Sequence, residues 1–389
     1  MRGNVVVRVS TSLVLLSCAA GLFLGACTAN AQTIHELSYN GSSWTDANLN
    51  GATSEPYTGI GAFVTTPNDQ RHVYYIDYNS YDVRQLFFNG TSWADDDLTV
   101  LSGASVGADG SVAVSGFSVG NYQYVYYIGA EEDVHQLLYN NSRWTDTNLS
   151  AAAGGPIAGS SALIVLNTSP ALHVFYTDAY TGHVHQLFAT NGTNWQDQDL
   201  TNVTGGTVAS GSPMAGFNIG NEQYLYFIDT HNHLHQFLYN NVQWSDEDLS
   251  ALTKTSAFSR SGVTALVLPG TKQLRAYVLS AKGHILQLAS TNNMTWTSSD
   301  LTARAKAPLP ADYYFAAYTS APKNALHLNY IGYANPNYLS VIQLSQPTAA
   351  TWGYEDLTAL TNGAIPENDY ANMAGFSLQS HQYLYYVGQ

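Results

Sequence analysis

Short runs of β-branched and aromatic residues alternate with Gly-, Asn- and Asp-rich turns along most of the chain. One unit shows the pattern: a small-residue run at 112–117, an aromatic run at 124–128, the run Val-His-Gln-Leu-Leu-Tyr at 134–139 and a polar run at 144–149. Short runs bounded by turn residues in this way are typical of antiparallel strands. No segment shows the periodicity of a helix. The unit therefore predicts one four-stranded antiparallel sheet.

All seven tryptophans occupy the same place in this unit, at the start of its fourth run. They are spaced by 49 to 56 residues, and self-similarity at this period is the mark of propeller blades. The tryptophans are Trp44, Trp93, Trp144, Trp195, Trp244, Trp296 and Trp352. Copies of the third run occur at 34–37, 83–86, 184–187 and 234–237, with weaker ones at 285–288 and 341–344. The chain is therefore expected to form an all-β, seven-bladed β-propeller with four antiparallel strands in each blade.

The two ends of the repeat region supply complementary half blades. It opens on a third run (34–40) and a fourth run (44–49), and it finishes on a first run (373–378) and a second (383–387). Pairing the two halves would remove both open sheet edges. We therefore expect residues 32–389 to form one ring, closed by its N-terminal and C-terminal half blades.

The first 31 residues have the features of an export signal. Arg2 and Arg8 give a basic start, and the apolar run 12–24 is too short to span a bilayer. Two processing routes remain open. The run 24–27 resembles a bacterial lipobox, which would leave a lipid anchor on Cys27, whereas 29–31 is an A-x-A site that would release a protein beginning at Gln32. Either route predicts a secreted, periplasmic or cell-surface protein.

Composition narrows the possible functions. Both cysteines lie in the leader, so the ring is expected to have no disulfide and no thiol chemistry. The chain has 13 basic and 28 acidic residues, a net charge of −15, and no basic stripe, which argues against nucleic-acid binding. Neither a nucleophile elbow, a P-loop nor a zinc-protease motif occurs. We expect no catalysis and no cofactor.

A polar position in the third run is followed eight or nine residues later by tryptophan, as in Glu36 to Trp44, Gln136 to Trp144 and Gln186 to Trp195. With the aromatic second run, this pattern resembles the fungal fucose-specific lectin family over residues 34–389. The resemblance implies a sugar site in each groove between blades. There an Arg at the start of the second strand and a Glu in the third would act with an aromatic residue of the following blade.

Carried over to this chain, the family's site residues are mostly replaced. The Glu position holds Glu36 and otherwise Gln85, Gln136, Gln186, Gln236, Gln287 and Gln343. The Arg position holds Arg275 and otherwise His72, His173, His327, Tyr124, Tyr224 and Tyr383. The resemblance thus groups Tyr383 and Glu36 with Trp93, and Arg275 and Gln287 with Trp352. No groove is expected to combine the Arg with the Glu.

Indole rings and planar amides suit a neutral sugar. An indole packs on the apolar face of a pyranose, and an amide both donates to and accepts from hydroxyls. Without charge-assisted bonds each site is expected to be weak, but several sites on one ring gain on the order of 10²–10⁴ in avidity. We therefore predict a lectin with several weak inter-blade sites for glycans, fucose being the candidate sugar. The alternative is a non-catalytic scaffold that binds protein or cell-wall polymer, and a propeller hydrolase is a third possibility.

Structural explanations compete with these site assignments. The tryptophans could fill space between blades, and the third-run glutamines could be buried amides satisfied by the backbone. The Asp or Asn before each Leu is expected to cap a turn: Asn48, Asp97, Asn148, Asp199, Asp248, Asp300 and Asp356. His231, His233 and His235 alternate, as metal ligands on one strand face would. The first two fall in a turn and no other repeat copies the cluster, so no metal site is expected.

Overall fold

The computed structural model describes residues 32–49, 56, 59–65, 69–104, 114–159, 163–209, 211, 213–321, 324–335, 338–347, 351–366 and 373–389. The expected signal peptide, with Cys27 and both cleavage sites, lies outside these residues, as do residues 112 and 113 of the first run described above. Residues 31–389 form one compact unit. No helix within the described ranges has the length and apolar character needed to cross a membrane.

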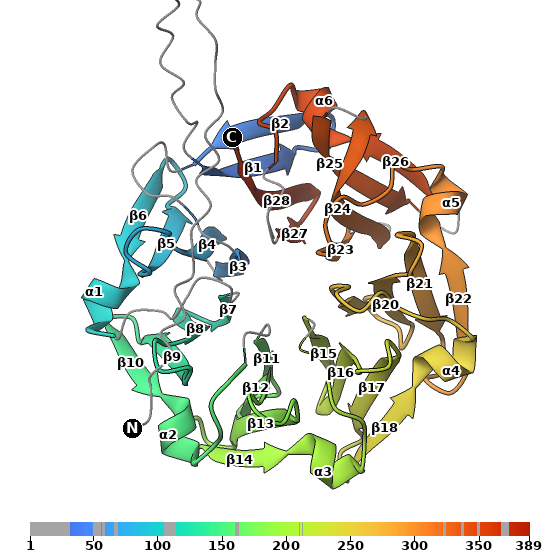
Figure 1. Ribbon diagram of the computed structural model, residues 1–389. Coiled ribbons are helices and arrows are strands. Elements are labelled where there is room, and N and C mark those ends of the chain that lie inside the picture. Colours follow the sequence, from blue (N-terminus) through green and yellow to red (C-terminus); the bar gives the residue numbers. More distant parts are fainter. Residues whose placement is uncertain are drawn as a thin grey trace, which may run out of the picture. The chain divides into compact units, whose positions relative to one another are not determined.

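Seven four-stranded antiparallel sheets are arranged in a ring (Figure 1), which confirms the seven-bladed β-propeller. The first strand of each blade lies nearest the centre and the fourth lies at the rim. Blades 1 to 3 are β3 (Gly61–Thr65), β4 (Gln70–Ile76), β5 (Val83–Phe88) and β6 (Trp93–Asp97); β7 (Ser115–Val119), β8 (Tyr122–Ile128), β9 (Val134–Tyr139) and β10 (Trp144–Asn148); and β11 (Ile164–Asn167), β12 (Leu172–Thr177), β13 (Val184–Ala189) and β14 (Gln196–Asp199). Blades 4 to 6 are β15 (Ala215–Ile219), β16 (Glu222–Ile228), β17 (Leu234–Tyr239) and β18 (Trp244–Asp248); β19 (Thr264–Val267), β20 (Leu274–Leu279), β21 (Ile285–Ser290) and β22 (Trp296–Asp300); and β23 (Ala316–Ser320), β24 (Ala325–Asn335), β25 (Tyr338–Gln346) and β26 (Gly353–Asp356).

Blade 7 closes the ring with strands from both ends of the chain. Its order is β27 (Ala374–Leu378), β28 (His381–Gly388), β1 (Thr33–Tyr39) and β2 (Trp44–Asn48). Strands β1 and β28 are antiparallel neighbours, with Leu37 opposite Leu384. The predicted joining of two half blades is confirmed, and no sheet edge is left between the termini.

Both faces of each blade are buried because each blade packs against a neighbour on either side. In β8, Tyr126 packs with Leu187 of blade 3, while Val125 and Tyr127 on the opposite face pack with Tyr74 of blade 1. Successive residues of a strand point to opposite faces, so neighbours in the sequence belong to different grooves. The core is therefore divided among the seams between blades.

The structure contains short helices that no periodicity in the sequence indicated. In the described part of the chain six helices of five residues each follow the fourth strands, at the rim of the ring (Figure 1). They are α1 (Leu98–Ser102), α2 (Leu149–Ala153), α3 (Leu200–Thr204), α4 (Leu249–Thr253), α5 (Leu301–Ala305) and α6 (Leu357–Thr361). Five residues make little more than one turn, which is too short for a helical period to show in the sequence.

The predicted capping role of the residue before each Leu holds in these six places, although it caps a helix and not a turn. The caps are Asp97, Asn148, Asp199, Asp248, Asp300 and Asp356. In blade 4, for example, Asp248 Oδ1 accepts the Ala251 N–H at 2.8 Å. Asn48 donates its side-chain amide to Thr33 Oγ1 at 3.1 Å, and residues 50–55, which the predicted cap concerns, lie outside the described residues.

Candidate functional site

The groove between blades 1 and 2 collects an imidazole, two amides and two aromatic rings. Strands β4 and β5 supply His72 and Gln85, and blade 2 supplies Gln123, Tyr139 and Trp144. Together with Gln70, Phe87 and Asp96, these residues line a cavity of about 190 Å³. The structure thus brings together the predicted set of His72, Gln85 and Trp144.

Two other grooves repeat the arrangement. Between blades 3 and 4, a cavity of about 430 Å³ is lined by His173, Gln186, Gln223, Tyr239 and Trp244. Between blades 6 and 7, a cavity of about 490 Å³ is lined by His327, Gln343, Gln382, Tyr39 and Trp44. Both volumes fall within the usual range for small-molecule sites, about 300–1,000 Å³. We call these three seams the Gln grooves.

The glutamine that the following blade contributes to each Gln groove was not among the predicted site residues. Gln123, Gln223 and Gln382 stand directly before Tyr124, Tyr224 and Tyr383. Each points to the opposite face of the strand from that tyrosine, into the preceding groove. A signal was present in the sequence, because all three occur as Gln-Tyr in the second strand, whereas the other blades carry Arg or Leu before His or Arg.

The histidines of the Gln grooves are held neutral by their surroundings. Gln85 Nε2 donates to His72 Nδ1 at 2.5 Å, so the proton lies on Nε2, which donates to Thr65 Oγ1 at 3.2 Å. His173 has the same pair of contacts, with Gln186 at 2.7 Å and Thr168 at 2.9 Å. Burial lowers the pKa of His72, His173 and His327 to about 4. In the first two grooves the ring therefore orients a glutamine and has no nitrogen free for a ligand.

The amides across each Gln groove contact one another or a buried tyrosine. Gln186 Nε2 donates to Gln223 Oε1 at 3.0 Å, and Tyr74 OH donates to Gln123 Oε1 at 2.6 Å. In blade 6, Tyr318 OH donates to Gln382 Oε1 at 3.1 Å. Each following-blade glutamine thus accepts through Oε1, and within the described ranges its NH₂ group has no partner. Gln85 Oε1 is a buried acceptor, also with no partner there.

Three other seams have leucine in place of that second glutamine, and we call them the Leu grooves. Leu172 packs with Tyr126 and Trp195 between blades 2 and 3, and Leu274 packs with Tyr226 and Trp296 between blades 4 and 5. The predicted glutamines turn to these buried hydroxyls. Gln136 Nε2 donates to Tyr126 OH at 2.9 Å, and Gln236 Nε2 donates to Tyr226 OH at 2.8 Å. Tyr124 and Tyr224 belong to the same packed clusters.

The third Leu groove, between blades 5 and 6, contains the predicted Arg275. Its guanidinium donates to Leu274 O at 2.8 Å and to Gln273 Oε1 at 3.1 Å, both within its own strand region. Gln287 Nε2 donates to Tyr277 OH at 3.2 Å. Trp352 packs in the cluster that contains Leu326. Among the described residues, Arg275 forms no hydrogen bond or ion pair with Gln287 or Trp352.

The groove between blades 7 and 1 holds a buried ion pair. Glu36 Oε2 accepts from Arg71 Nη1 at 2.7 Å and from Tyr385 OH at 2.8 Å. The guanidinium carbon lies 4.4 Å from the ring centre of Phe88, 4.5 Å from that of Tyr383 and 5.2 Å from that of Trp93. Glu36, Tyr383 and Trp93 are therefore brought together as predicted, around a cation that the prediction lacked.

This groove combines an Arg with a Glu, although the Arg does not come from the family's Arg position. Arg71 directly precedes His72 and points to the opposite face of β4, so it enters the groove on the other side of its blade. It comes from the following blade, whereas the family pattern places Arg and Glu on one blade. Burial raises the pKa of Glu36 above its ordinary value, against the lowering effect of Arg71.

Comparisons with known proteins agree with the fold and with the resemblance found in the sequence. The model of the fungal fucose-specific lectin family matches residues 14–178, which confirms the resemblance seen in the sequence. No curated protein matches the chain by sequence. Among solved structures, the BP39L lectin from Burkholderia pseudomallei aligns with a TM-score of 0.60 at 16% identity, covering 82% of this chain and 89% of that one.

A variant of the Aleuria aurantia lectin in complex with α-methyl-L-fucoside aligns with a TM-score of 0.55 at 19% identity, covering 78% of this chain and 96% of that one. A variant of AofleA from Arthrobotrys oligospora aligns at 12% identity with a TM-score of 0.55, over 92% of this chain and 94% of that one. At these identities the likeness shows a shared propeller fold. The Aleuria lectin is described as six-bladed, so the ring of this chain has one blade more.

Proposed function

We propose that this protein is a non-catalytic lectin that binds a neutral sugar in its three Gln grooves. The observation that carries the proposal is the recurrence of one set, a buried histidine, two glutamines, a tyrosine and a tryptophan, around a cavity in three seams. The family match and the lectin identity of the structural neighbours support it. Fucose is the first candidate sugar because the Aleuria lectin holds α-methyl-L-fucoside.

The chemistry of the Gln grooves suits a neutral pyranose. Trp244 and Tyr239 offer aromatic surface to the apolar face of a sugar, and their ring centres lie 5.5 Å apart. Gln186 and Gln223 are linked across the floor, so their remaining amide atoms are held in place for hydroxyl groups. His173 is held uncharged, which leaves no charge to attract an acidic sugar.

Three equivalent sites on one rigid ring favour a dense glycan over a single sugar. Amide hydrogen bonds without charge assistance make each site weak. Simultaneous binding of several sugars raises avidity by on the order of 10²–10⁴. This arrangement suits an exported protein that meets a glycan surface, with the leader providing secretion or, through Cys27, a lipid anchor.

A glycan array probed with the purified full-length protein tests the proposal. We expect binding to neutral glycans, with fucosylated ones tested first. The matched variant carries Gln123→Leu, Gln223→Leu and Gln382→Leu, which gives the three Gln grooves the residue found naturally in the Leu grooves. Binding should then be lost while the far-UV circular dichroism is unchanged. An array with no bound glycan would favour the scaffold alternative, and undiminished binding by the triple variant would place the sites elsewhere.

A further inference from the structure

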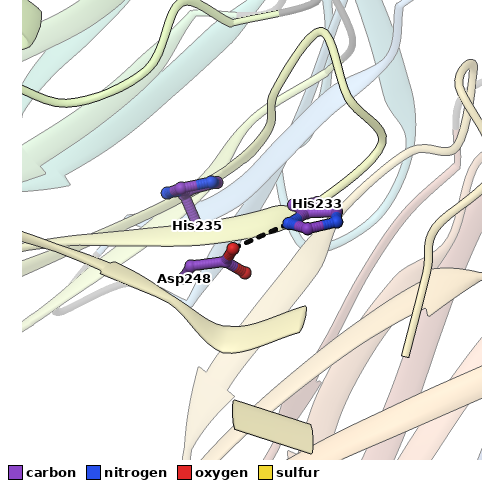
Figure 2. Close-up of side chains that lie close together, drawn as sticks. All are labelled: His233, His235 and Asp248. Atoms are coloured by element: carbon purple, nitrogen blue, oxygen red, sulfur yellow. Dashed lines mark hydrogen bonds and ion pairs between the residues drawn. The ribbon is translucent and has the colours of Figure 1, made fainter. Parts of the chain in front are cut away.

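A second cluster, at the end of blade 4 opposite to its tryptophan, has the composition of a metal site. His233 immediately precedes β17, His235 lies within it, and Asp248 is the last residue of β18 (Figure 2). His235 and Asp248 are cross-strand partners. One ligand atom from each of the three residues lies within 4.8 Å of the others. The turn that was expected to separate these histidines in fact brings His233 against Asp248, with Nδ1 and Oδ2 2.7 Å apart.

The scaffold fixes one atom of the buried histidine and one of the carboxylate. The other nitrogen of the buried histidine, His235 Nε2, lies 3.3 Å from Thr207 Oγ1 and 3.5 Å from Asp229 Oδ2, so a bound ion would replace these contacts. His235 Nδ1 is hydrogen-bonded to Asp246 Oδ1 at 2.9 Å. Asp248 Oδ1 accepts the Ala251 N–H at 2.8 Å as the cap of α4, so Oδ2 remains for the histidines. A second carboxylate that orients a ligating imidazole is the usual outer shell of a metal site.

The cluster is also reachable from solvent. The side chain of His235 is 5% exposed, whereas those of His233 and Asp248 are 40% and 30% exposed. An ion could therefore enter past the two outer ligands and keep a position open for water. Two imidazoles and one carboxylate are ligands that Zn²⁺ and similar first-row ions accept. We propose that His233, His235 and Asp248 bind a divalent transition-metal ion of the zinc class.

Two other blades provide internal comparisons. Blade 3 has His183, His185 and Asp199 in the corresponding places, with His183 Nδ1 2.8 Å and His185 Nε2 4.0 Å from Asp199 Oδ2. That pair of histidines escaped the sequence analysis, which found no copy of the cluster. Blade 5 keeps the outer pair, His284 Nδ1 and Asp300 Oδ2 at 2.6 Å, but has Leu286 where blade 4 has His235. Blade 5 is therefore a natural control with one imidazole missing.

The site is independent of the proposed sugar grooves. Trp244 begins β18 and Asp248 ends it, which separates the two by roughly 13 Å along the strand at about 3.3 Å per residue. Metal binding is therefore expected to leave glycan binding unchanged, and the two proposals can fail separately.

Titration of tag-free protein with ZnCl₂ at pH 7.5, followed by isothermal calorimetry, tests the metal site. The informative variant is Asp248→Asn, because asparagine keeps the helix cap, as Asn148 does in blade 2, and removes the anionic ligand. Its matched control is Asp300→Asn in blade 5, which makes the same change at a cap beside a single histidine. We expect saturable binding that weakens 10–100-fold in Asp248→Asn and in His233→Ala and is unchanged in Asp300→Asn.

Three results would overturn the assignment. The first is no saturable zinc binding by the wild-type protein. The second is equal affinity in wild type and Asp248→Asn. The third is binding that survives Asp248→Asn but is lost in Asp199→Asn, which would place the ion on blade 3.

Discussion

At the seam between blades 1 and 2, Gln123 faces Gln85 across an open cavity, whereas at the seam between blades 7 and 1 the equivalent position holds Arg71, which faces Glu36. The amide leaves room beside Trp144. The guanidinium reaches further, pairs with the carboxylate and packs against three aromatic rings, including Trp93. The residue before the predicted site position on the second strand thus decides what a groove contains.

The Leu grooves extend the same comparison. With leucine at that position, the facing glutamine bonds to a tyrosine hydroxyl of its own blade and the tryptophan joins an apolar cluster. One backbone geometry therefore supports a polar cavity, an apolar seam or an enclosed ion pair. Repetition of a fold does not make its seams chemically equal.

The largest expected effect is a difference in glycan avidity between variants that lack the tryptophans of the Gln grooves and variants that lack those of the Leu grooves. Replacing Trp44, Trp144 and Trp244 with leucine removes the aromatic wall of all three Gln grooves. We expect avidity for a glycan-coated surface to fall by on the order of 10²–10⁴, because multivalent contact is lost. This avidity is measured by surface plasmon resonance on an immobilised neutral glycan. The control set, Trp195, Trp296 and Trp352 in the Leu grooves, should keep its avidity after the same change, and equal losses in both sets would refute the distinction.

Breaking the Arg71–Glu36 ion pair tests whether that pair stabilises the groove between blades 7 and 1. Glu36→Gln leaves the buried Arg71 unpaired and should lower the free energy of unfolding by about 3–5 kcal/mol. Adding Arg71→Gln rebuilds the amide pair of the Gln grooves, so the double variant should regain most of this loss. Urea unfolding of the two single variants and the double variant gives the coupling. Simple additivity of the single effects would show that the pair is not coupled.

Acid should destabilise the Gln grooves through their histidines. The pKa of His173 is about 4 in the folded protein, below its ordinary value of 6.5, so the unfolded chain binds more protons between these values. Stability should therefore fall as the pH drops from 6.5 toward 4, by up to about 3 kcal/mol for this residue. His173→Phe should flatten that part of the profile in chemical unfolding followed across this range. An unchanged slope would mean that His173 is not held neutral.

Extended above pH 6.5, the same titrations should show an opposite contribution from the histidines near the rim of the ring. Hydrogen bonds and charges from Asp197 and Asp246 outweigh burial and raise the pKa of His185 and His235. Their stabilising effect is present below pH 6.5 and is lost as the pH rises through the raised values. The two groups of histidines therefore give opposite signs.

The smallest expected effect is the loss of stability on removing a helix cap, which should be the same in a blade that lines a Gln groove and in a blade that lies between two Leu grooves. Asp199 caps a helix beside His183 in blade 3, which lines a Gln groove, and Asp300 caps one beside His284 between two Leu grooves. Replacing either with alanine should cost about 1 kcal/mol, because one helix-end N–H loses its acceptor. Thermal unfolding of the two variants should give matching shifts. Unequal shifts in unfolding temperature would mean that the stability of the rim helices depends on the residues of the neighbouring groove.

The period of the tryptophans and the half blades at the two ends were enough to predict the ring, because each blade repeats its own short-range pattern. The groupings of His72, His173 and His327 with their glutamines were also predictable, since they share one strand face or a fixed offset. Arg71 and Gln123 were not predicted. Each sits next to a recognised site residue but points across a different seam, so a search within one blade does not find it. The helices escaped because five residues carry no measurable period.

The most direct test of the central idea is a crystal structure of the protein soaked with a neutral monosaccharide selected on the array. We predict sugar in the three Gln grooves, with its apolar face on Trp44, Trp144 and Trp244 and its hydroxyls on the paired glutamines. Sugar bound instead beside Trp195, Trp296 or Trp352, or three Gln grooves left without sugar at a saturating concentration, would contradict it.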